Sequence, residues 1–343
     1  MAVRLKDVAQ ALNLSISTVS AVLHNRADFS EATRKRVLRK VEELHYQPNS
    51  LARSLVTRKT HVLGVIVPSL GLGFPVATLL AGIDATTHPS GYHFVVFNTD
   101  GDSDREDVGL ATLMGRQVDG LIIASSHPRT GNRTWARLRK SQVPFVLVDR
   151  FFPSVPFVGA DNERVGFMAT RHLVEQGYRK IALLTGSRHV MTRFGRYRGY
   201  MRALREAGLP VRRNHVIEVD SDIEASGYAG AKKLLNLPSR PDAIFAINDL
   251  LAVDAMRAVR EFGLQVPHDF GVVGTGNLPY DDHLRIPLTS VEVPPAQVGK
   301  LAASILLDMI DGRPAPAKPV LLQPRIIVRE SSSRLAKAQG TSD

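Results

Sequence analysis

The sequence predicts an all-α headpiece with a helix-turn-helix and a hinge helix, followed by an α/β core of two doubly wound lobes. Three observations lead to this fold class. Short amphipathic helix patterns fill the first 47 residues. Strand and helix patterns then alternate in two consecutive series, which is typical of parallel sheets. The net charge of +11 is unevenly spread, since residues 1–60 hold 11 basic and only 5 acidic side chains.

The basic charge of the N-terminal end indicates which type of partner the protein could bind. A compact basic end on a nearly neutral body is the charge distribution expected of a protein that binds phosphates. A solubilising basic arm would carry the same charge, so charge alone leaves both interpretations open.

Three short helices are predicted in this end. Asn13 follows the first helix and tolerates the left-handed conformation of a helix C-terminus. Ser15 and Ser30 are placed to cap a second helix, Ile16–His24, and a third helix that runs to about His45. The expected inward side chains are Leu5, Val8, Ala9 and Leu12, then Val19, Val22 and Leu23, then Val37, Leu38, Val41 and Leu44. Together these helices predict a helix-turn-helix unit.

The second helix should enter the major groove of DNA with its N-terminal end first. Ile16 and Ser17 are best placed to touch base edges: Ile16 can contact thymine methyls or sugars, and Ser17 discriminates weakly because it can donate or accept. Side chains able to bond phosphates, which position the protein without reading sequence, are Thr18, Ser20, His24, Asn25 and Arg26.

A short conditional helix should follow the headpiece. Pro48 ends the third helix, Asn49 can cap a helix to about Val56, and a polar linker follows. A helix of about eight residues is marginal in water, so it would need its symmetry mate or DNA to form.

The core pattern predicts where a ligand binds. Strands are expected at 62–67, 93–98, 120–124, 145–149 and 157–159, then near 180–184, 215–219, 242–247, 270–274 and 289–293. Helices are expected near 75–89, 103–116, 131–141, 162–177, 195–208, 222–236, 249–263 and 294–311. Ligands of parallel sheets bind beyond the carboxyl ends of the strands, so we expect a site in the cleft between the two lobes.

Polar side chains at these strand ends are the candidate ligand contacts. Ser69 and Asn248 each follow a predicted strand, Asp149 ends one, and Arg196 begins a predicted helix. Asp149 could instead cap a loop, and Asn248 could cap its own helix. The segment Ser187–Arg198 holds four arginines, which suit an anionic effector if they face the cleft, but which could also point into solvent or pair across the lobe.

Several classes of protein are disfavoured. There is no cysteine, and the phosphate-binding, zinc-protease and serine-nucleophile motifs are absent, so we expect no enzyme, no cofactor and no metal. No apolar run reaches the roughly 18 residues of a membrane span, and the N-terminus lacks a secretory apolar segment. We therefore expect a cytoplasmic protein without membrane contact.

Motifs at fixed spacing carry a family resemblance. In the headpiece they are Asp7-Val8-Ala9, Leu14-Ser15, Thr18-Val19-Ser20, Thr33-Arg34, Val37, Leu44 to Asn49 and Ala52 to Leu55. In the core they are Asp161-Asn162, Gly166, His172-Leu173, Gly177 to Ala182, Pro324-Arg325 and Val328 to Ser331. With these motifs the chain resembles the LacI/GalR family of bacterial transcriptional repressors, to about Ser332.

The resemblance implies roles for headpiece residues. Ile16, Ser17 and Ala21 stand at base-reading positions, although Ala21 departs from the Arg or His often found there. Leu55 matches a leucine that paired hinge helices insert into the minor groove, which kinks the DNA. The expected DNA-binding set is Ser15, Ile16, Ser17, Thr18, Ser20, Ala21, His24, Asn25, Arg26, Asn49, Arg53 and Leu55.

The resemblance also implies a domain organisation. The core is similar to periplasmic sugar-binding proteins, in which the chain crosses between lobes three times, here near 160, 291 and 323. The expected divisions are headpiece 1–47, hinge helix and linker 48–60, core 61–332 and a disordered tail 333–343. Within the core, lobe one is about 61–160 with 292–322, and lobe two is about 161–291 with 323–332.

For the effector, the resemblance matches Asp149, Arg196 and Asn248 to positions that bond sugar hydroxyls, and Phe74 to an apolar wall. Two positions depart from the pattern and weaken the usual pyranose site. Gly276 stands where many relatives have a ligand-binding Asp, and Asp222 stands where many have a stacking aromatic. The expected effector-binding set is Ser69, Phe74, Asp149, Arg196, Asp222, Asn248 and Gly276.

The prediction is a sequence-specific DNA-binding regulator, in the family's habit a repressor. It should bind a near-palindromic double-stranded operator as a homodimer, because the tail shows no leucine heptads that would build a tetramer. The expected effector is a carbohydrate, either a sugar or a phosphorylated or acidic derivative, that changes the angle between the lobes and thereby the hinge helices. The alternative is a solute-binding protein without DNA binding.

Overall fold

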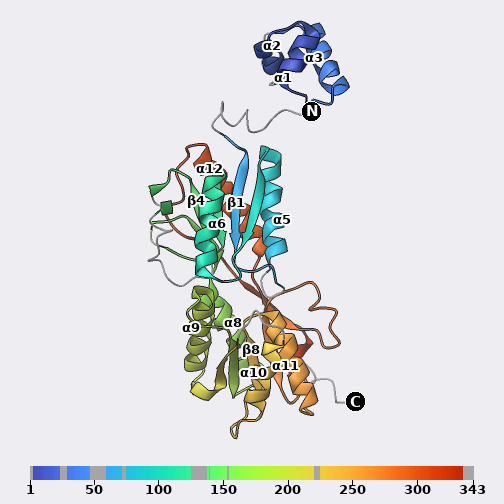
Figure 1. Ribbon diagram of the computed structural model, residues 1–343. Coiled ribbons are helices and arrows are strands. Elements are labelled where there is room, and N and C mark those ends of the chain that lie inside the picture. Colours follow the sequence, from blue (N-terminus) through green and yellow to red (C-terminus); the bar gives the residue numbers. More distant parts are fainter. Residues whose placement is uncertain are drawn as a thin grey trace. The chain divides into compact units, whose positions relative to one another are not determined.

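The structure is a computed structural model that describes residues 3–23, 29–46, 59–71, 75–124, 137–138, 140–152, 154–219 and 225–334. The chain divides into two units, residues 1–60 and 61–343, and each is considered by itself. Figure 1 labels the helices and strands.

The described part of the first unit holds three helices, α1 (Leu5–Leu12), α2 (Ile16–Leu23) and α3 (Glu31–Glu43). Asn13 ends α1 with φ +52°, and its N–H donates to the carbonyls of the preceding turn. Ser15 Oγ accepts from Thr18 N at 3.0 Å, and Ser30 Oγ accepts from Thr33 N at 3.3 Å, so both serines cap the helices they precede. The local capping signals therefore account for where α2 and α3 begin.

The core of this unit is a small apolar cluster shared by the three helices. Its buried members are Val8, Ala9, Leu12, Val19, Val22 and Val37. Leu38 was expected to face inward, and this expectation is wrong, because its side chain is 48% exposed. Val37, Val41 and Leu44 follow helical spacing on one stripe, and Leu38 lies about 100° around the helix from Val37.

The second unit contains two six-stranded sheets in the part of the chain that is described. One sheet has the order β11-β5-β4-β3-β1-β2 and the other has the order β12-β10-β9-β8-β6-β7. Neighbouring strands are parallel, except that β10 and β12 are antiparallel. The first sheet is built from β1 (Val62–Val67), β2 (His93–Asn98), β3 (Gly120–Ala124), β4 (Phe145–Val148), β5 (Phe157–Ala160) and β11 (Val320–Leu322). The second is built from β6 (Ile181–Thr185), β7 (Val216–Glu218), β8 (Ala243–Ala246), β9 (Gly271–Gly276), β10 (Thr289–Glu292) and β12 (Arg325–Ile327).

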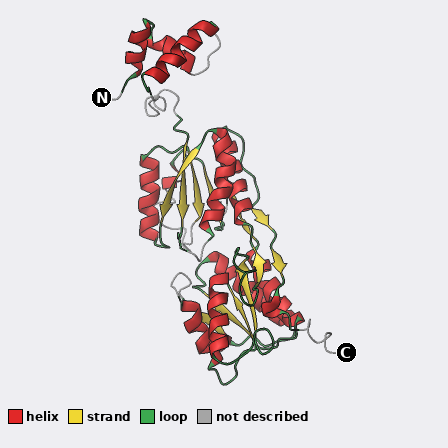
Figure 2. Ribbon diagram, turned by 90° about the vertical axis from the view of Figure 1, so that its right-hand side faces the viewer, coloured by secondary structure: helices red, strands yellow, loops and turns green. Residues whose placement is uncertain are grey.

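Each sheet is the centre of a lobe with helices on both faces (Figure 2). In lobe one, α5 (Val76–Thr87) and α12 (Pro295–Ile310) share one apolar cluster, and α6 (Ser103–Gly115) belongs to the cluster on the other face. In lobe two, the pair α8 (Asn162–Glu175) and α9 (Met191–Glu206) and the pair α10 (Ser226–Leu235) and α11 (Asp249–Glu261) flank the sheet. Short 3₁₀ turns are η1 (His88–Ser90), η2 (Arg213–His215) and η3 (Glu330–Ser332). The predicted fold class of two doubly wound lobes is confirmed.

The chain passes between the sheets three times. It leaves the first sheet after β5, returns after β10 to form α12, and leaves again between β11 and β12. These passages follow Ala160, Glu292 and Leu322. Three segments that are far apart in the sequence therefore join the two lobes. The strands that lead into these segments end in one region, where the lobes meet.

Glycines allow the helices to approach one another closely at this region. A Cβ on Gly166 of α8 would lie 1.9 Å from the carbonyl oxygen of Arg196, and one on Gly199 would lie 2.0 Å from that of Glu163. In lobe one, a Cβ on Gly82 of α5 would lie 2.0 Å from the carbonyl oxygen of Ala296. The backbone that carries Arg196 is thus fixed by direct contact with α8.

Two expected helices differ from the structure. α9 was expected to begin near 195 but begins at Met191, so Arg196 lies in its second turn rather than at its start. Val190 precedes the helix and offers no side-chain cap, so the sequence carries no start signal there. The helix expected at 131–141 falls largely outside the described residues.

Candidate functional site

The N-terminal end of α2 is the candidate DNA-reading surface. Ile16 is 52% exposed and Ser17 is exposed, whereas Thr18, Ser20 and Ala21 are half-buried. Ile16 lies in the first turn of α2, three residues before the buried Val19, but its own side chain projects out of the core. An isoleucine that projects from a helix N-terminus is suited to thymine methyl groups in the major groove.

Hydroxyl groups around the start of α2 are linked to one another. Ser15 Oγ lies 2.7 Å from Ser17 Oγ and 2.8 Å from Thr18 Oγ1. This orients the serine that was predicted to read bases and leaves part of its hydrogen-bonding capacity for a base edge. The first turn of α2 holds no acidic side chain, which favours an approaching phosphate.

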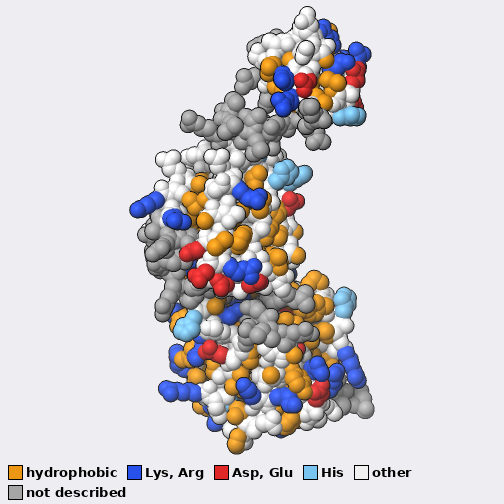
Figure 3. Space-filling view, viewed as in Figure 1, with side chains coloured by type: hydrophobic (Ala, Val, Ile, Leu, Met, Phe, Trp, Pro, Cys, Tyr) orange, Lys and Arg blue, Asp and Glu red, His pale blue; other side chains and the backbone are white. Residues whose placement is uncertain are grey.

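Basic side chains of α3 divide between internal and surface roles. Arg36 donates from Nη2 to the carbonyl oxygen of Leu12, which ties α3 to the end of α1. Arg39 and Lys40 both pair with Glu43. Figure 3 shows Lys and Arg side chains on the visible face of this unit. The predicted DNA contacts His24, Asn25, Arg26, Asn49, Arg53 and Leu55 lie outside the described residues.

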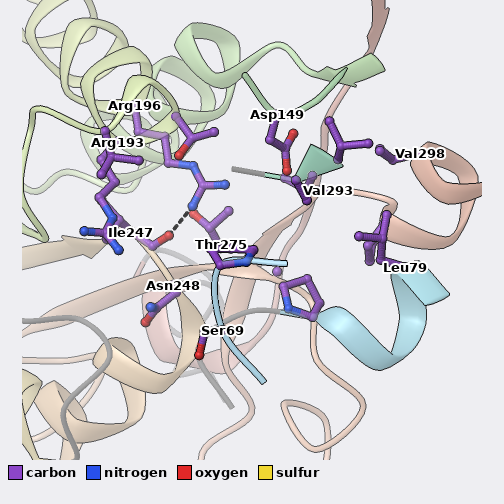
Figure 4. Close-up of a pocket in the computed structure, with 18 of the residues that line it drawn as sticks. Ser69, Leu79, Asp149, Arg193, Arg196, Ile247, Asn248, Thr275, Val293 and Val298 are labelled. Carbon is purple, nitrogen blue, oxygen red and sulfur yellow. Dashed lines mark hydrogen bonds between the residues drawn. The ribbon is translucent and has the colours of Figure 1, made fainter. Parts of the chain in front are cut away.

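The second candidate site is a cavity of about 160 Å³ between the two lobes of the core (Figure 4). Of the predicted effector-binding residues, five line it, and these are Ser69, Asp149, Arg196, Asn248 and Gly276. Phe74 and Asp222 lie outside the described residues. Other lining residues are Pro68, Pro75, Leu79, Gly101, Ala124, Val148, Val190, Thr192, Arg193, Ile247, Thr275, Val293, Pro295 and Val298.

Asp149 follows β4 directly and adopts the left-handed region, with φ +56°. Its backbone N–H donates to Val158 O at 3.0 Å. Burial raises the pKa of Asp149, while the charge of Arg196 and the N–H of Ala160 oppose that rise. The next residue, Arg150, is only 2% exposed and its Nη1 lies 3.4 Å from Glu106 Oε1. This buried ion pair anchors the loop that carries Asp149.

Arg196 reaches from α9 into the cavity (Figure 4). Its Nε donates to Asn162 Oδ1 at 2.9 Å, and its Nη1 donates to the carbonyl oxygen of Ile247. Burial lowers the pKa of Arg196 to about 10, and the negative charge of Asp149 acts in the opposite direction. The guanidinium is therefore held in a fixed orientation, with its charge only partly neutralised by the protein.

Asn248 and Ser69 both have local partners. Asn248 Oδ1 accepts from Leu251 N at 2.8 Å and caps α11, as the capping alternative proposed. Its amide group still lines the cavity, so both roles are open to the same side chain. Ser69 Oγ accepts from Gly71 N at 2.9 Å, just after the end of β1.

Gly276 has a physical reason to lack a side chain. Its φ is +138°, and a Cβ there would lie 2.7 Å from Asp249 Oδ2. Asp249 is itself completely buried, with Oδ1 accepting from Ser290 Oγ at 2.7 Å. The space in which an acidic side chain of residue 276 would begin is thus taken by a carboxylate from α11.

A second carboxyl group lies beside Asp249. The N–H of Leu278 lies 3.3 Å from Asp249 Oδ2 and 2.9 Å from Asp281 Oδ2, and Asp281 is also completely buried. Burial raises the pKa of both acids, that of Asp281 to about 8, with the charge of Asp249 as its next cause. The raised pKa of Asp281 favours a state in which this buried pair holds one proton below about pH 8. This pair was not predicted from the sequence, because nothing in the residue pattern indicates that Asp281 is buried.

The arginines of the basic segment separate into two groups. Arg188 pairs with Glu218 and lies over the Tyr197 ring at 4.8 Å, and Arg198 Nη2 lies 3.1 Å from Glu163 Oε2. Arg193 and Arg196 line the cavity. Two of the four arginines therefore line the cavity, as one alternative expected, and the other two pair with acidic side chains of lobe two, as the other alternative expected. On the face shown in Figure 3, the remaining basic side chains of lobe two are scattered rather than gathered in one block.

No group of three or more His, Cys, Asp or Glu side chains that could hold a metal ion occurs among the described residues. In the same part of the chain, every helix is too short or too polar to cross a membrane.

Comparison with known proteins bears on both units. Residues 4–49 match a family model described as bacterial regulatory proteins, lacI family, and residues 170–332 match one described as periplasmic binding protein-like domain. The chain is 32% identical over 335 residues to the HTH-type transcriptional repressor PurR of Aliivibrio salmonicida, and the match covers 96% of this chain and 99% of that protein. This chain belongs to the lacI family of bacterial regulatory proteins.

Solved structures of similar proteins have the same fold. The lac repressor dimer bound to operator and the anti-inducer ONPF is 26% identical, with a TM-score of 0.86 and coverage of 97% of this chain and 99% of that one. The complex of the transcriptional regulator CelR with cellobiose is 30% identical, with a TM-score of 0.73 and coverage of 96% and 99%. The resemblance drawn from the sequence motifs is thereby confirmed.

Proposed function

We propose that this lacI-family protein is a sequence-specific DNA-binding repressor, controlled by a small molecule that binds between the lobes of its core. The observation that carries the proposal is the combination, in one chain, of a helix with an exposed reading end and a cavity lined by both lobes. The first feature serves DNA recognition, and the second serves ligand recognition. An enzyme or a simple solute-binding protein would need only the second.

The similar proteins support partners of particular kinds. One is a repressor dimer bound to operator, and another is a regulator bound to cellobiose. For this chain we therefore propose a homodimer, a near-palindromic double-stranded operator and an effector of the carbohydrate class or an acidic derivative of it. Ile16, Ser17 and Ala21 are the proposed base-facing residues, and the lining residues Asp149 and Arg196 are proposed effector contacts.

A route from the cavity to the lobe connections is present in the structure. Arg196 Nε bonds Asn162 Oδ1, and Asn162 Nδ2 donates to Ala160 O at 3.1 Å, where the chain first passes between the lobes. Asp149, on the opposite lobe, is held by the N–H of Ala160 as well. An effector that contacts both Arg196 and Asp149 binds one orientation of the lobes more tightly than another. This difference in affinity couples effector binding in the cavity to DNA binding by the headpiece.

The DNA-binding part is tested with Ile16→Ala in the full chain. DNA fragments flanking the gene are assayed by fluorescence anisotropy at about 150 mM salt, because phosphate contacts make the affinity strongly salt-dependent. The unaltered protein should bind one fragment specifically, and Ile16→Ala should bind it about tenfold more weakly, since one lost base contact costs about 1–3 kcal/mol.

Leu38→Ala is the matched control, because Leu38 is a similarly exposed apolar residue of the headpiece that lies on α3. Its operator affinity should stay within about twofold of the unaltered protein. No specific fragment at all would contradict the proposal and favour a solute-binding protein. Equal losses in both variants would contradict the placement of Ile16 against the bases.

A further inference from the structure

The two walls of the cavity differ in chemistry. Lobe one contributes mainly apolar side chains, and these are Pro68, Pro75, Leu79, Ala124, Val148 and Val298. Lobe two contributes a polar wall that includes Thr192, Arg193, Arg196, Asn248 and Thr275. A ligand that satisfies both walls has a polar end and a less polar remainder.

The described cavity lining holds more basic than acidic side chains. Among the described lining residues, Arg193 and Arg196 carry guanidinium groups, and Asp149 carries the one carboxylate. Burial raises the pKa of Asp149, which weakens its ability to neutralise Arg196. Arg196 uses Nε and Nη1 within the protein, and its Nη2 makes no hydrogen bond to the described part of the chain. A planar guanidinium with a free edge suits an oxyanion.

Thr275 is a buried polar residue on this wall, and the described part of the chain leaves its hydroxyl unpaired. It lies in β9, is 3% exposed and lines the cavity, and its Oγ1 has no hydrogen-bond partner among the described residues. Buried polar groups almost always have a partner, so an unpaired hydroxyl at a cavity wall points to one supplied by a ligand.

The neighbouring carboxylate does not serve Thr275. A Cβ on Gly274 would lie 2.1 Å from Asp249 Oδ1, so Asp249 lies directly beneath the glycines that flank Thr275. Its two oxygens accept from Ser290 Oγ and Leu278 N instead. No described side chain therefore competes with a ligand for the threonine hydroxyl.

We propose that Thr275 is a specificity-determining residue whose hydroxyl donates to an anionic group of the effector, a carboxylate or a phosphate, that also lies against Arg196. The less polar remainder of the effector then packs against Pro75, Leu79 and Val298 of lobe one. This inference rests on the proposed function and narrows the class of its effector. It also explains how a site with glycine at 276 still selects a ligand.

The test is calorimetric titration of the full chain with matched neutral and anionic compounds. The pairs are ribose and ribose 5-phosphate, glucose and glucose 6-phosphate, and benzyl alcohol and benzoate. At least one anion should bind at least tenfold more tightly than its neutral partner. Thr275→Val, which replaces the hydroxyl with a methyl group of similar size, should weaken that anion about tenfold, which corresponds to about 1.4 kcal/mol.

Thr170→Val is the matched control. Thr170 in α8 is also fully buried, its Oγ1 likewise has no hydrogen-bond partner in the described residues, and it is not part of the cavity lining. Both variants remove a buried unpaired hydroxyl, so both should fold with unchanged or slightly higher stability. Only Thr275→Val should lose affinity for the anion.

Four outcomes would overturn the inference: neutral compounds that bind as tightly as their anionic partners, no binding of any anion, an unchanged affinity in Thr275→Val, or an equal loss in Thr170→Val. Operator binding is measured on the same proteins, so that failure of the anionic-effector inference can be distinguished from failure of the proposed function. A neutral sugar that binds and alters operator affinity would leave the regulator intact while refuting the anionic effector.

Discussion

Replacing Asp281 with asparagine should remove much of the pH dependence of the core's stability between pH 5.5 and pH 8. Asp281 is completely buried beside Asp249, and its Oδ1 has no hydrogen-bond partner in the described part of the chain. Burial and the charge of Asp249 raise the pKa of Asp281 to about 8, while Arg329 opposes the rise. Asparagine resembles the protonated acid, since its Oδ1 can accept from Leu278 N and its amide can donate to Asp249.

The sign and size of the effect follow from the raised pKa. The folded chain holds a proton up to about pH 8, whereas the unfolded chain releases it near the ordinary value of 3.8. The stabilising contribution is therefore complete at low pH and is lost as the pH rises from about 4 to about 8. At 1.36 kcal/mol per pKa unit, roughly 3 kcal/mol of stability is lost between pH 5.5 and pH 8. An asparagine side chain does not titrate, so Asp281→Asn should lose far less.

The assay is urea unfolding of the full chain, followed by circular dichroism at pH 5.5 and pH 8, with the core transition fitted separately from the headpiece. The two proteins should be similarly stable at pH 5.5, and the variant should be more stable at pH 8. Asp282→Asn is the control, because it makes the same substitution at the neighbouring residue, whose side chain is 64% exposed and pairs with Arg329. Parallel pH profiles for Asp281→Asn and the unaltered protein would refute the shared proton.

Two further predictions concern the packing and capping that hold the sites in place. Gly166→Ala should destabilise the core by about 1–3 kcal/mol in urea unfolding, because its Cβ would overlap the carbonyl oxygen of Arg196. Gly115→Ala, at the end of α6 with nothing near the added methyl group, should be neutral or slightly stabilising, and an equal loss there would show that the close contact does not matter. Ser15→Ala should cost the headpiece about 1 kcal/mol in thermal unfolding, because Thr18 N loses its cap; an unchanged midpoint would contradict that role.

Much of the fold could be predicted from local patterns. The apolar runs of β1 and β3 are short, continuous and bounded by polar residues or proline, which indicates strands buried on both faces. Asn13 and Ser15 mark the turn between α1 and α2, because left-handed backbone and N-capping are properties of single residues and their neighbours. Alternation of such elements was enough to predict two parallel-sheet lobes.

The wrong expectations arose where local signals were missing or ambiguous. Leu38 follows Val37 directly, and apolar character alone did not show which of the two faces the core. The start of α9 was placed too late, because Val190 cannot cap the helix through its side chain. Both errors concern positions at which packing against other elements, rather than intrinsic preference, sets the outcome.

The residues of the candidate cavity also divide into those that the sequence predicts and those that only the structure reveals. Strand-end residues Asp149 and Asn248 were predicted from chain order alone, because the carboxyl ends of parallel strands gather at one edge of a sheet, and the structure places both in the cavity lining. Their role as effector contacts stays a prediction. By contrast, Thr275 and the acid pair of Asp249 and Asp281 could not be identified from the sequence. Whether a polar group is buried, and whether it has a partner, depends on segments distant in the chain that come together only when the lobes fold.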